Sequence, residues 1–230
     1  MDHGNDFLRL YEEILLLALH DEKGTVHFGA LFDQAAGGAI LAELLLLGKL
    51  GVTGEKGKAR VVVRDPAPCG DPLLDECLDR VAGDTKARKP VEWVQKFTGV
   101  KRLKHRTARR LVTRGVLKEG RGRIFLLFNR TLYPEADSGP ERELKRRIKR
   151  AVVGSTTEID PRTVLLIALA KHTDLLKHAV DKRVLKDHEG RVKKLVAGEV
   201  AGEATREAME ALRAAIMVAV FVPVITSTAT

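Results

Sequence analysis

Cysteine, aromatic residues and long apolar runs are scarce in this sequence, and each scarcity excludes a class of protein. The 230 residues include two cysteines, Cys69 and Cys77, so one disulfide is possible by count, but two reduced cytosolic thiols are favoured. Aromatic residues make up 4% of the chain, so the core must consist mainly of Leu, Val, Ile and Ala. The most apolar segment, Ala214 to Ile225, is too short to span a bilayer and contains a proline.

Catalytic and metal-binding motifs are also missing from the sequence. There is no Gly-x-Ser-x-Gly elbow, no His-Glu-x-x-His and no cysteine or histidine spacing typical of a metal site. The run Gly54 to Lys58 approaches a phosphate-binding loop, but Val52 stands where that loop needs glycine and Ala59 where it needs Ser or Thr. We therefore expect neither an enzyme nor a cofactor or metal ion.

No stretch has the pattern of a targeting segment. The first seven residues, MDHGNDF, are acidic rather than basic, and Glu12 and Glu13 interrupt the apolar run that follows. A secretory signal peptide has the opposite pattern, with a basic start and an uninterrupted apolar stretch. We expect a soluble, cytoplasmic protein whose contact with any membrane is peripheral.

Positive charge is concentrated in two segments. The chain carries a net charge of +9, and the segment from Lys101 to Arg123 alone carries ten Lys or Arg residues against Glu119. A second basic segment, Glu141 to Arg150, adds six basic residues against two acidic ones. Such local concentration indicates an anionic partner, although a basic run can also be no more than a solvated helix face.

The larger basic segment, from Val100 to Phe128, reads as an amphipathic helix, a glycine stop at Gly115 and a β-hairpin. Strands are expected at 116–119 and 124–128, joined by a turn at 120–123. One side of the helix is apolar, the opposite side carries arginines, and two lysines lie on the flank between them. The apolar positions are Val100, Leu103, Thr107 and Leu111. The arginines on the opposite side are Arg102, Arg106 and Arg109, and the flanking lysines are Lys101 and Lys104.

Helical periodicity dominates the rest of the chain, so the expected fold class is mainly α: one domain, a helical bundle around an apolar C-terminal helix. Asp71-Pro72 and Asp160-Pro161 predict helix starts, since aspartate caps a helix and proline suits its first position. A short β-branched strand at 59–63 is expected to pair with residues 50–52. The remaining helices are expected at 6–20, 29–47, 90–97, 138–153 with Ser138 as its cap, 181–196 and 202–222.

Three stretches resemble a known family. They are Leu10 to Leu19 (LYEEILLLAL), Asp71 to Glu76 (DPLLDE), and Gly115 to Leu117 (GVL) followed by Ile124 to Phe128 (IFLLF). Together they are similar to the Golgi phosphoprotein 3 family, peripheral membrane proteins that bind phosphatidylinositol 4-phosphate. The resemblance covers nearly the whole chain. It implies a single, mostly helical domain with a hairpin that mediates self-association.

The resemblance also implies a site for the lipid headgroup. The family's basic positions before the hairpin correspond to Lys101 and Lys104, with Arg106 nearby. The position of an exposed tryptophan is held by Phe28, and that of a second arginine by Gly37. This implies that anion binding is retained and leaves the selectivity for one phosphoinositide open. The residues implied for self-association are those of the hairpin, namely Ile124, Phe125, Leu126, Leu127 and Phe128.

Two other functions remain open at this stage. A basic helix followed by a hairpin is also the layout of a winged helix, in which Arg102, Arg106 and Arg109 would face DNA and Arg121 and Arg123 would extend from the wing. Against this, no helix-turn-helix pair is clear from the sequence. The third possibility is a self-associating scaffold with no lipid ligand. For the lipid-binding function, the expected location is the Golgi in a eukaryote and the inner face of the plasma membrane in a prokaryote.

Overall fold

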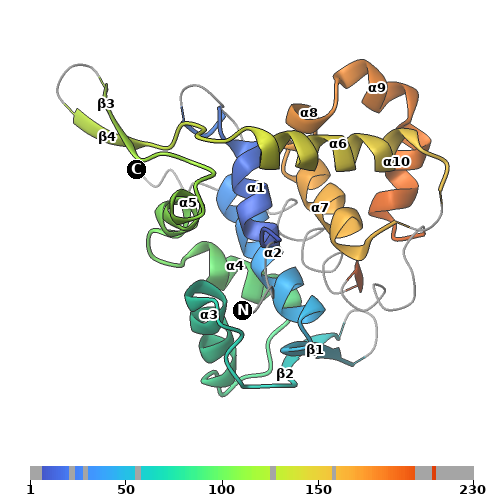
Figure 1. Cartoon of the computed structure of the whole chain (residues 1–230). Helices are drawn as coiled ribbons and strands as arrows, with labels where there is room; N and C mark the ends of the chain where they lie inside the picture. Colours follow the sequence, from blue (N-terminus) through green and yellow to red (C-terminus); the bar gives the residue numbers. More distant parts are fainter. Residues whose placement is uncertain are drawn as a thin grey trace, which may run out of the picture.

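The protein is mainly helical with two small antiparallel hairpins, as the sequence predicts (Figure 1). The computed structural model describes residues 7–20, 24–27, 31–54, 58–124, 128–156, 159–199 and 209–210. The helices are α1 (Leu10–Ala18), α2 (Phe32–Leu46), α3 (Pro72–Ala82), α4 (Pro90–Thr98), α5 (Leu103–Thr113), α6 (Gly139–Val153), α7 (Pro161–His172), α8 (Leu176–Ala179), α9 (Lys182–Asp187) and α10 (Glu189–Val196). The strands are β1 (Leu50–Thr53), β2 (Arg60–Val63), β3 (Gly120–Ile124) and β4 (Phe128–Leu132).

Helices α1 and α2 form the centre of the fold. All nine residues of α1 are buried, and α2 is buried over most of its length. α2 packs against α1, α4 and α7, and α7 has an unbroken buried run from Thr163 to Ala170. A helix that is apolar on all sides is stable only when other helices surround it, which explains this central position. The buried apolar side chains of the described residues form one contiguous core.

The other elements lie around this centre in separate groups (Figure 1). α3, α4 and the β1–β2 hairpin lie at one end of the molecule, and α6 to α10 lie together to one side. The β3–β4 hairpin projects away from the helical body. Between that hairpin and α3 lies α5, which packs against α1. The basic helix is therefore a peripheral element attached to the core by one face.

Two helix starts confirm the Asp-Pro predictions. The Asp71 side chain accepts hydrogen bonds from the N–H groups of Leu73 and Leu74 at 3.0 and 3.2 Å, and Asp160 accepts one from Thr163 at 3.1 Å. Such capping satisfies N–H groups that have no partner in the first helical turn.

The predicted cap of α6 is confirmed in its position, because Ser138 is the N-cap residue, but not in its bonding. Ser138 precedes the helix, but its side chain makes no capping hydrogen bond. Asp137, one residue earlier, accepts the N–H of Gly139 at 2.8 Å instead. A carboxylate is a stronger acceptor than a hydroxyl for an N–H at the positive end of a helix, which explains why Asp137 accepts this hydrogen bond and Ser138 does not.

The first hairpin confirms the predicted strand pairing. β1 and β2 are antiparallel, with Leu50 opposite Val63 and Thr53 opposite Arg60. The β-branched run in β2 indicated this strand, because such side chains suit a pleated and partly buried surface.

The second hairpin follows the basic helix as predicted, but its strands lie further along the chain. The expected turn, Gly120 to Arg123, is part of β3, and Gly120 pairs with Leu132 of β4. The glycines that suggested a turn allow a close cross-strand approach instead: a Cβ atom on Gly122 would lie 2.6 Å from Cδ1 of Leu132. Glycine in a strand often marks such a contact.

The shift also relocates the residues expected to mediate self-association. Ile124 ends β3 and is paired with Phe128, which begins β4. Phe125, Leu126 and Leu127, expected in the second strand, lie outside the described residues. Their part in self-association stays a prediction.

The predicted C-terminal helix, 202–222, is described only at Met209 and Glu210. Met209 is buried. The expectation that this helix occupies the centre of the bundle therefore concerns residues outside the described part of the chain. Within that part, the centre is formed by α1 and α2.

Both cysteines are free thiols. Burial raises the pKa of Cys77 to about 12. Burial, together with the hydrogen bond to Asp75, raises the pKa of Cys69 to about 11. Because the thiolate is the nucleophilic form, both side chains are poorly reactive at neutral pH.

Candidate functional site

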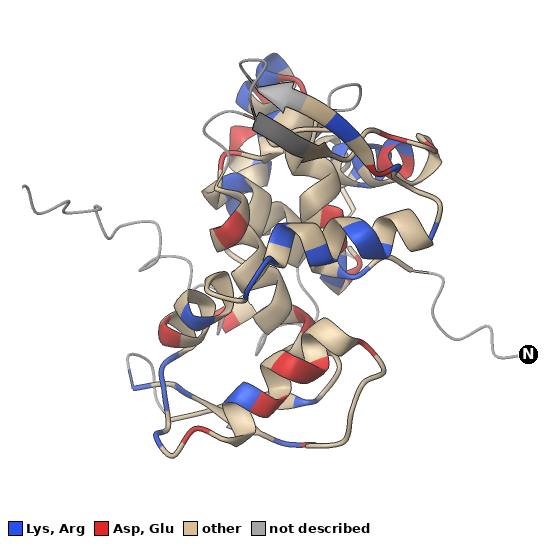
Figure 2. Ribbon diagram, turned by 90° about the vertical axis from the view of Figure 1, so that its left-hand side faces the viewer, with Lys and Arg blue, Asp and Glu red and all other residues tan. Residues whose placement is uncertain are grey.

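Helix α5 divides its side chains between the interior and the surface. The predicted apolar stripe is confirmed, since Val100, Leu103, Thr107 and Leu111 are all buried. Arg102 lies in the left-handed region with φ of 59° and immediately precedes the helix. In Figure 2, α5 crosses the view below the hairpin and carries basic residues but no acidic one.

Arg110, in the last turn of α5, and Arg114, just after the helix, form ion pairs with buried carboxylates. Arg110 Nε lies 3.0 Å from Glu12 Oε1, and its Nη2 lies 3.3 Å from Asp71 Oδ2. Arg114 Nη1 lies 3.7 Å from Glu12 Oε2. Both carboxylates are completely buried and need such partners, because an unpaired buried charge is very costly.

Arg106 lies one helical turn before Arg110 on the same side of α5. Its guanidinium pairs with Glu76 of α3, and its Nη2 lies 3.4 Å from the carbonyl oxygen of Pro72. The sequence predicted that Arg106 faces an anionic ligand from the open side of the helix. In the structure it already has a carboxylate partner, so it can meet a headgroup only by sharing or leaving that partner.

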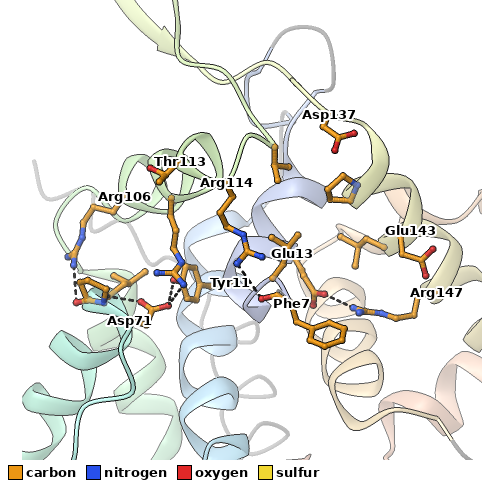
Figure 3. Close-up of a pocket in the computed structure, with 17 residues that line it drawn as sticks. Phe7, Tyr11, Glu13, Asp71, Arg106, Thr113, Arg114, Asp137, Glu143 and Arg147 are labelled. Atoms are coloured by element: carbon orange, nitrogen blue, oxygen red, sulfur yellow. Dashed lines mark hydrogen bonds and ion pairs between the residues drawn. The ribbon is translucent and has the colours of Figure 1, made fainter. Parts of the chain in front are cut away.

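These three arginines border a pocket of about 970 Å³ (Figure 3). On its far side, Arg147 of α6 lies with Nη2 2.7 Å from Glu13 Oε1. Burial raises the pKa of Glu13, and the Arg147 charge opposes that rise. The lining holds four arginines and four carboxylates, namely Arg106, Arg110, Arg114 and Arg147 with Glu13, Asp71, Asp137 and Glu143. Charge in this pocket is therefore balanced, and the pocket offers an anion little net attraction.

A second buried ion cluster surrounds Glu43 in α2. Its two carboxylate oxygens lie 2.8 and 2.9 Å from the two terminal nitrogens of Arg162, and Oε2 also accepts the N–H of Leu10 at 2.8 Å. Arg9 Nη1 lies 3.3 Å from Oε1. This one carboxylate joins α1, α2 and α7 in the middle of the core.

Sequence reasoning missed both clusters, although a signal was present. Glu43 interrupts the apolar run LAELLLL, and Glu12 and Glu13 interrupt LYEEILLL. A carboxylate in a helix that is buried on all sides needs a cationic partner or several hydrogen bonds. The sequence therefore indicated buried ion pairs without showing which arginines complete them.

The outward-facing basic residues lie at the start of α5. Lys101 and Arg102 are exposed, and Lys104 is partly exposed. Among the described residues, neither Lys101 nor Arg102 has a carboxylate within ion-pair distance. Partial burial lowers the pKa of His105, and the charges of Lys104 and Arg102 lower it further. The contribution of these two charges is that of a positive potential at this surface, which would attract an anion.

Gly37, the position where the family resemblance implies a lost arginine, lies in a close contact between α2 and α4. A Cβ atom there would lie 2.7 Å from the carbonyl oxygen of Val94 and 3.2 Å from Cγ2 of Thr98. Thr98 ends α4, three residues before Lys101, so Gly37 packs close to the start of the basic segment. Phe28, the other implied position, lies outside the described residues, and its place in the site stays a prediction.

Two kinds of feature are absent from the described part of the chain. No helix there is long and apolar enough to cross a membrane. Nor is there a group of three or more His, Cys, Asp or Glu side chains that could hold a metal ion.

Comparison with known proteins identifies the family. A model of the Golgi phosphoprotein 3 (GPP34) family matches residues 10–212. A similar protein is the vacuolar protein sorting-associated protein 74 of Eremothecium gossypii, 30% identical over 181 residues. That alignment covers 68% of this chain and 54% of the relative, so the chain spans about half of the relative's length. The family match includes α1 to α10, and with them the buried carboxylates of both ion clusters and the basic surface. The chain belongs to the Golgi phosphoprotein 3 family.

Proposed function

We propose that this protein is a non-enzymatic, peripheral membrane protein that binds anionic phospholipid headgroups, in particular a phosphoinositide such as phosphatidylinositol 4-phosphate. The binding surface is formed by Lys101, Arg102 and Lys104. The main support is the division of charge in the basic segment. Its inner arginines neutralise carboxylates of the fold, while the residues at the start of α5 face outward. A place at the Golgi and a role in membrane traffic belong to the same proposal and rest on the family.

The chemistry of the surface suits a loosely held phosphate. A Lys or Arg near an anionic leaflet contributes on the order of 1 kcal/mol to membrane binding. Lysine meets a phosphate as a point charge, whereas arginine can bind it through two parallel hydrogen bonds. With lysines at 101 and 104 and no cation at 37, we expect attraction to the headgroup with weaker selection among phosphorylated positions.

Charge reversal at the two lysines tests this surface. The double variant Lys101→Glu/Lys104→Glu removes two attractions of roughly 1 kcal/mol each and adds repulsion, so partitioning onto vesicles containing phosphatidylinositol 4-phosphate should fall more than about 30-fold. Co-sedimentation at fixed salt measures the effect, and vesicles of equal charge made with phosphatidylserine separate selectivity from attraction.

The matched control is Lys182→Glu/Lys186→Glu, which makes the same change of charge at two exposed positions of α9. We expect this variant to sediment almost as the parent does, because a remote charge is screened beyond about 10 Å at ordinary salt. Equal losses in both variants would show that net charge, not this surface, drives binding. Full binding by the Lys101→Glu/Lys104→Glu variant would overturn the proposal.

The structure also bears on the alternative of DNA binding. α4 and α5 are consecutive helices separated by residues 99–102, and a hairpin follows, so the element order of a winged helix is present. However, α4 packs mainly on α2 and α5 on α1, whereas a helix-turn-helix packs its two helices on each other. A gel-shift assay with duplex DNA at the same salt is the accompanying test. Binding that depends on Arg102 and Arg109 would favour this alternative.

Self-association through the β3–β4 hairpin is a further part of the proposal. The hairpin projects from the body, and a two-stranded ribbon is rarely stable without a covered face (Figure 1). Leu117 and Glu135 form an antiparallel β-bridge at the base of the hairpin. The two chain segments therefore stay together when a short linker replaces residues 120–132. We expect that deletion to leave a folded protein with a smaller mass in solution. An unchanged mass by light scattering would count against this role.

A further inference from the structure

Three histidine rings lie in one column that joins distant parts of the chain. The ring centroids of His20 and His27 are 3.7 Å apart, and those of His27 and His178 are 3.8 Å apart with the planes within 9° of parallel. His20 follows α1, His27 lies in the described segment 24–27, and His178 lies in α8. The ring of His27 thus lies between the end of α1 and α8.

The backbone holds this segment in place from both sides. The N–H of His27 donates to the carbonyl of Ala18 at 2.8 Å, and the N–H of His20 donates to that of Thr25 at 2.8 Å. At the start of the segment, Gly24 has a φ of 57°, and a Cβ atom there would lie 2.2 Å from the backbone nitrogen of Pro134. The chain therefore has a defined path, and that path brings the three rings together.

The charged groups around the column are mostly cationic. Burial lowers the pKa of His178, and Lys177, His20 and Lys145 of α6 lower it further. The opposing group is Asp174, which is itself paired with Lys177. Lys145 in turn pairs with Glu141, 2.5 Å away on the same helix. Neutral imidazoles stack as aromatic rings do, but two protonated rings in contact repel each other at short range.

We propose that the column of His20, His27 and His178 is an acid-sensitive latch. With neutral rings it holds the segment 24–27 against α1 and α8, and protonation separates the rings and releases the segment. The next residue along the chain is Phe28, the residue expected at the headgroup, so we also expect acidification to weaken its contribution to lipid binding. That second step rests on the proposed function, whereas the first does not.

The sign of the pH dependence follows from His178. Its pKa in the folded protein is below the ordinary value of about 6.5, so the folded state binds fewer protons than the unfolded state. The stability that the column contributes is therefore complete above about pH 6.5 and declines as the pH falls below that value.

Hydrogen exchange tests the latch without any lipid. We expect peptides covering residues 19–27 of the parent to lose protection by at least about tenfold between about pH 7.5 and about pH 5.5, after correction for intrinsic rates. The variant His178→Phe keeps an aromatic ring that cannot be charged, so its protection should change little. His172→Phe, at a half-buried histidine outside the column, should behave as the parent does.

Two results would overturn the latch: constant protection in the parent, or an equal loss in His178→Phe. Because that variant could misfold, histidine titration of the parent by NMR is an independent measurement. It should show His178 titrating below the ordinary histidine value and coupled to the ring that it stacks on, and titration of His178 at the ordinary value, independent of its neighbours, would contradict the proposal. In a vesicle assay, the difference between the parent and Phe28→Ala should shrink on acidification. No difference at either pH would count against Phe28 in lipid binding and leave the exchange result valid.

Discussion

Replacing Glu43 with alanine is expected to destabilise the protein by roughly 3–5 kcal/mol, the range for removing one partner of a buried ion pair. The Glu43 carboxylate is completely buried and accepts from both terminal nitrogens of Arg162, from Arg9 and from the N–H of Leu10. Its removal leaves the N–H of Leu10 without this acceptor and takes the nearest carboxylate from two arginines, so that Arg162 keeps the carbonyl of Leu8 at 3.0 Å and Arg9 keeps Asp71 at 3.8 Å. Urea unfolding followed by circular dichroism measures the change.

The matched control for this prediction is Glu189→Ala. Glu189 also pairs with a cation, Lys193 at 2.8 Å, but both side chains are largely exposed. Exposed pairs of this kind contribute about 0–1 kcal/mol, so the control should unfold almost as the parent does. A Glu43→Ala variant within about 1 kcal/mol of the parent would show that the core can rearrange around the two arginines that lose this carboxylate. In that case the cluster is not what joins α1, α2 and α7.

The parts of the fold that the sequence predicts are those fixed by local chemistry. The apolar stripe of α5 is read directly from helical periodicity, and its members from Val100 to Leu111 are buried. The Asp-Pro starts of α3 and α7 depend on two adjacent residues, and both caps form. The hairpin register depends on contacts across strands, such as Leu132 over Gly122, and glycine signals a turn and a close approach equally well.

The buried ion pairs depend on contacts that span most of the chain. Glu12 meets Arg110 across 98 positions, and Glu13 meets Arg147 across 134. From the sequence, every basic residue of this helix could bind a ligand. In the structure, its later arginines form ion pairs with carboxylates of α1 and of α3 with its cap. The outward surface at the start of α5, where Lys101 and Arg102 are exposed, lies apart from these internal pairs. The sequence alone does not show which arginines are paired inside the fold, so it could not separate them from the residues at the surface.

The position implied for a second headgroup-binding arginine illustrates the limit of transferring residues by resemblance. At Gly37 the close approach of α4 leaves no room for a side chain: the Cβ position is 2.7 Å from a backbone oxygen, which cannot rotate away as a side chain can. In this chain, glycine at 37 contributes to packing between α2 and α4. Restoring an arginine is therefore a test of packing as much as of lipid binding.

We expect Gly37→Arg to destabilise the protein and to leave vesicle binding no tighter than in the parent. Even Gly37→Ala should cost about 1–3 kcal/mol through overpacking, although alanine has the better helix propensity by about 1 kcal/mol.

The matched control is Gly190→Ala in α10, where a Cβ atom would meet nothing within 4 Å. There the propensity alone acts, so the control should be unchanged or more stable. Thermal unfolding and co-sedimentation on the same samples measure both effects. A Gly37→Arg protein as stable as the parent, with tighter binding to phosphatidylinositol 4-phosphate, would show that α4 yields at this contact and that the side chain reaches the headgroup.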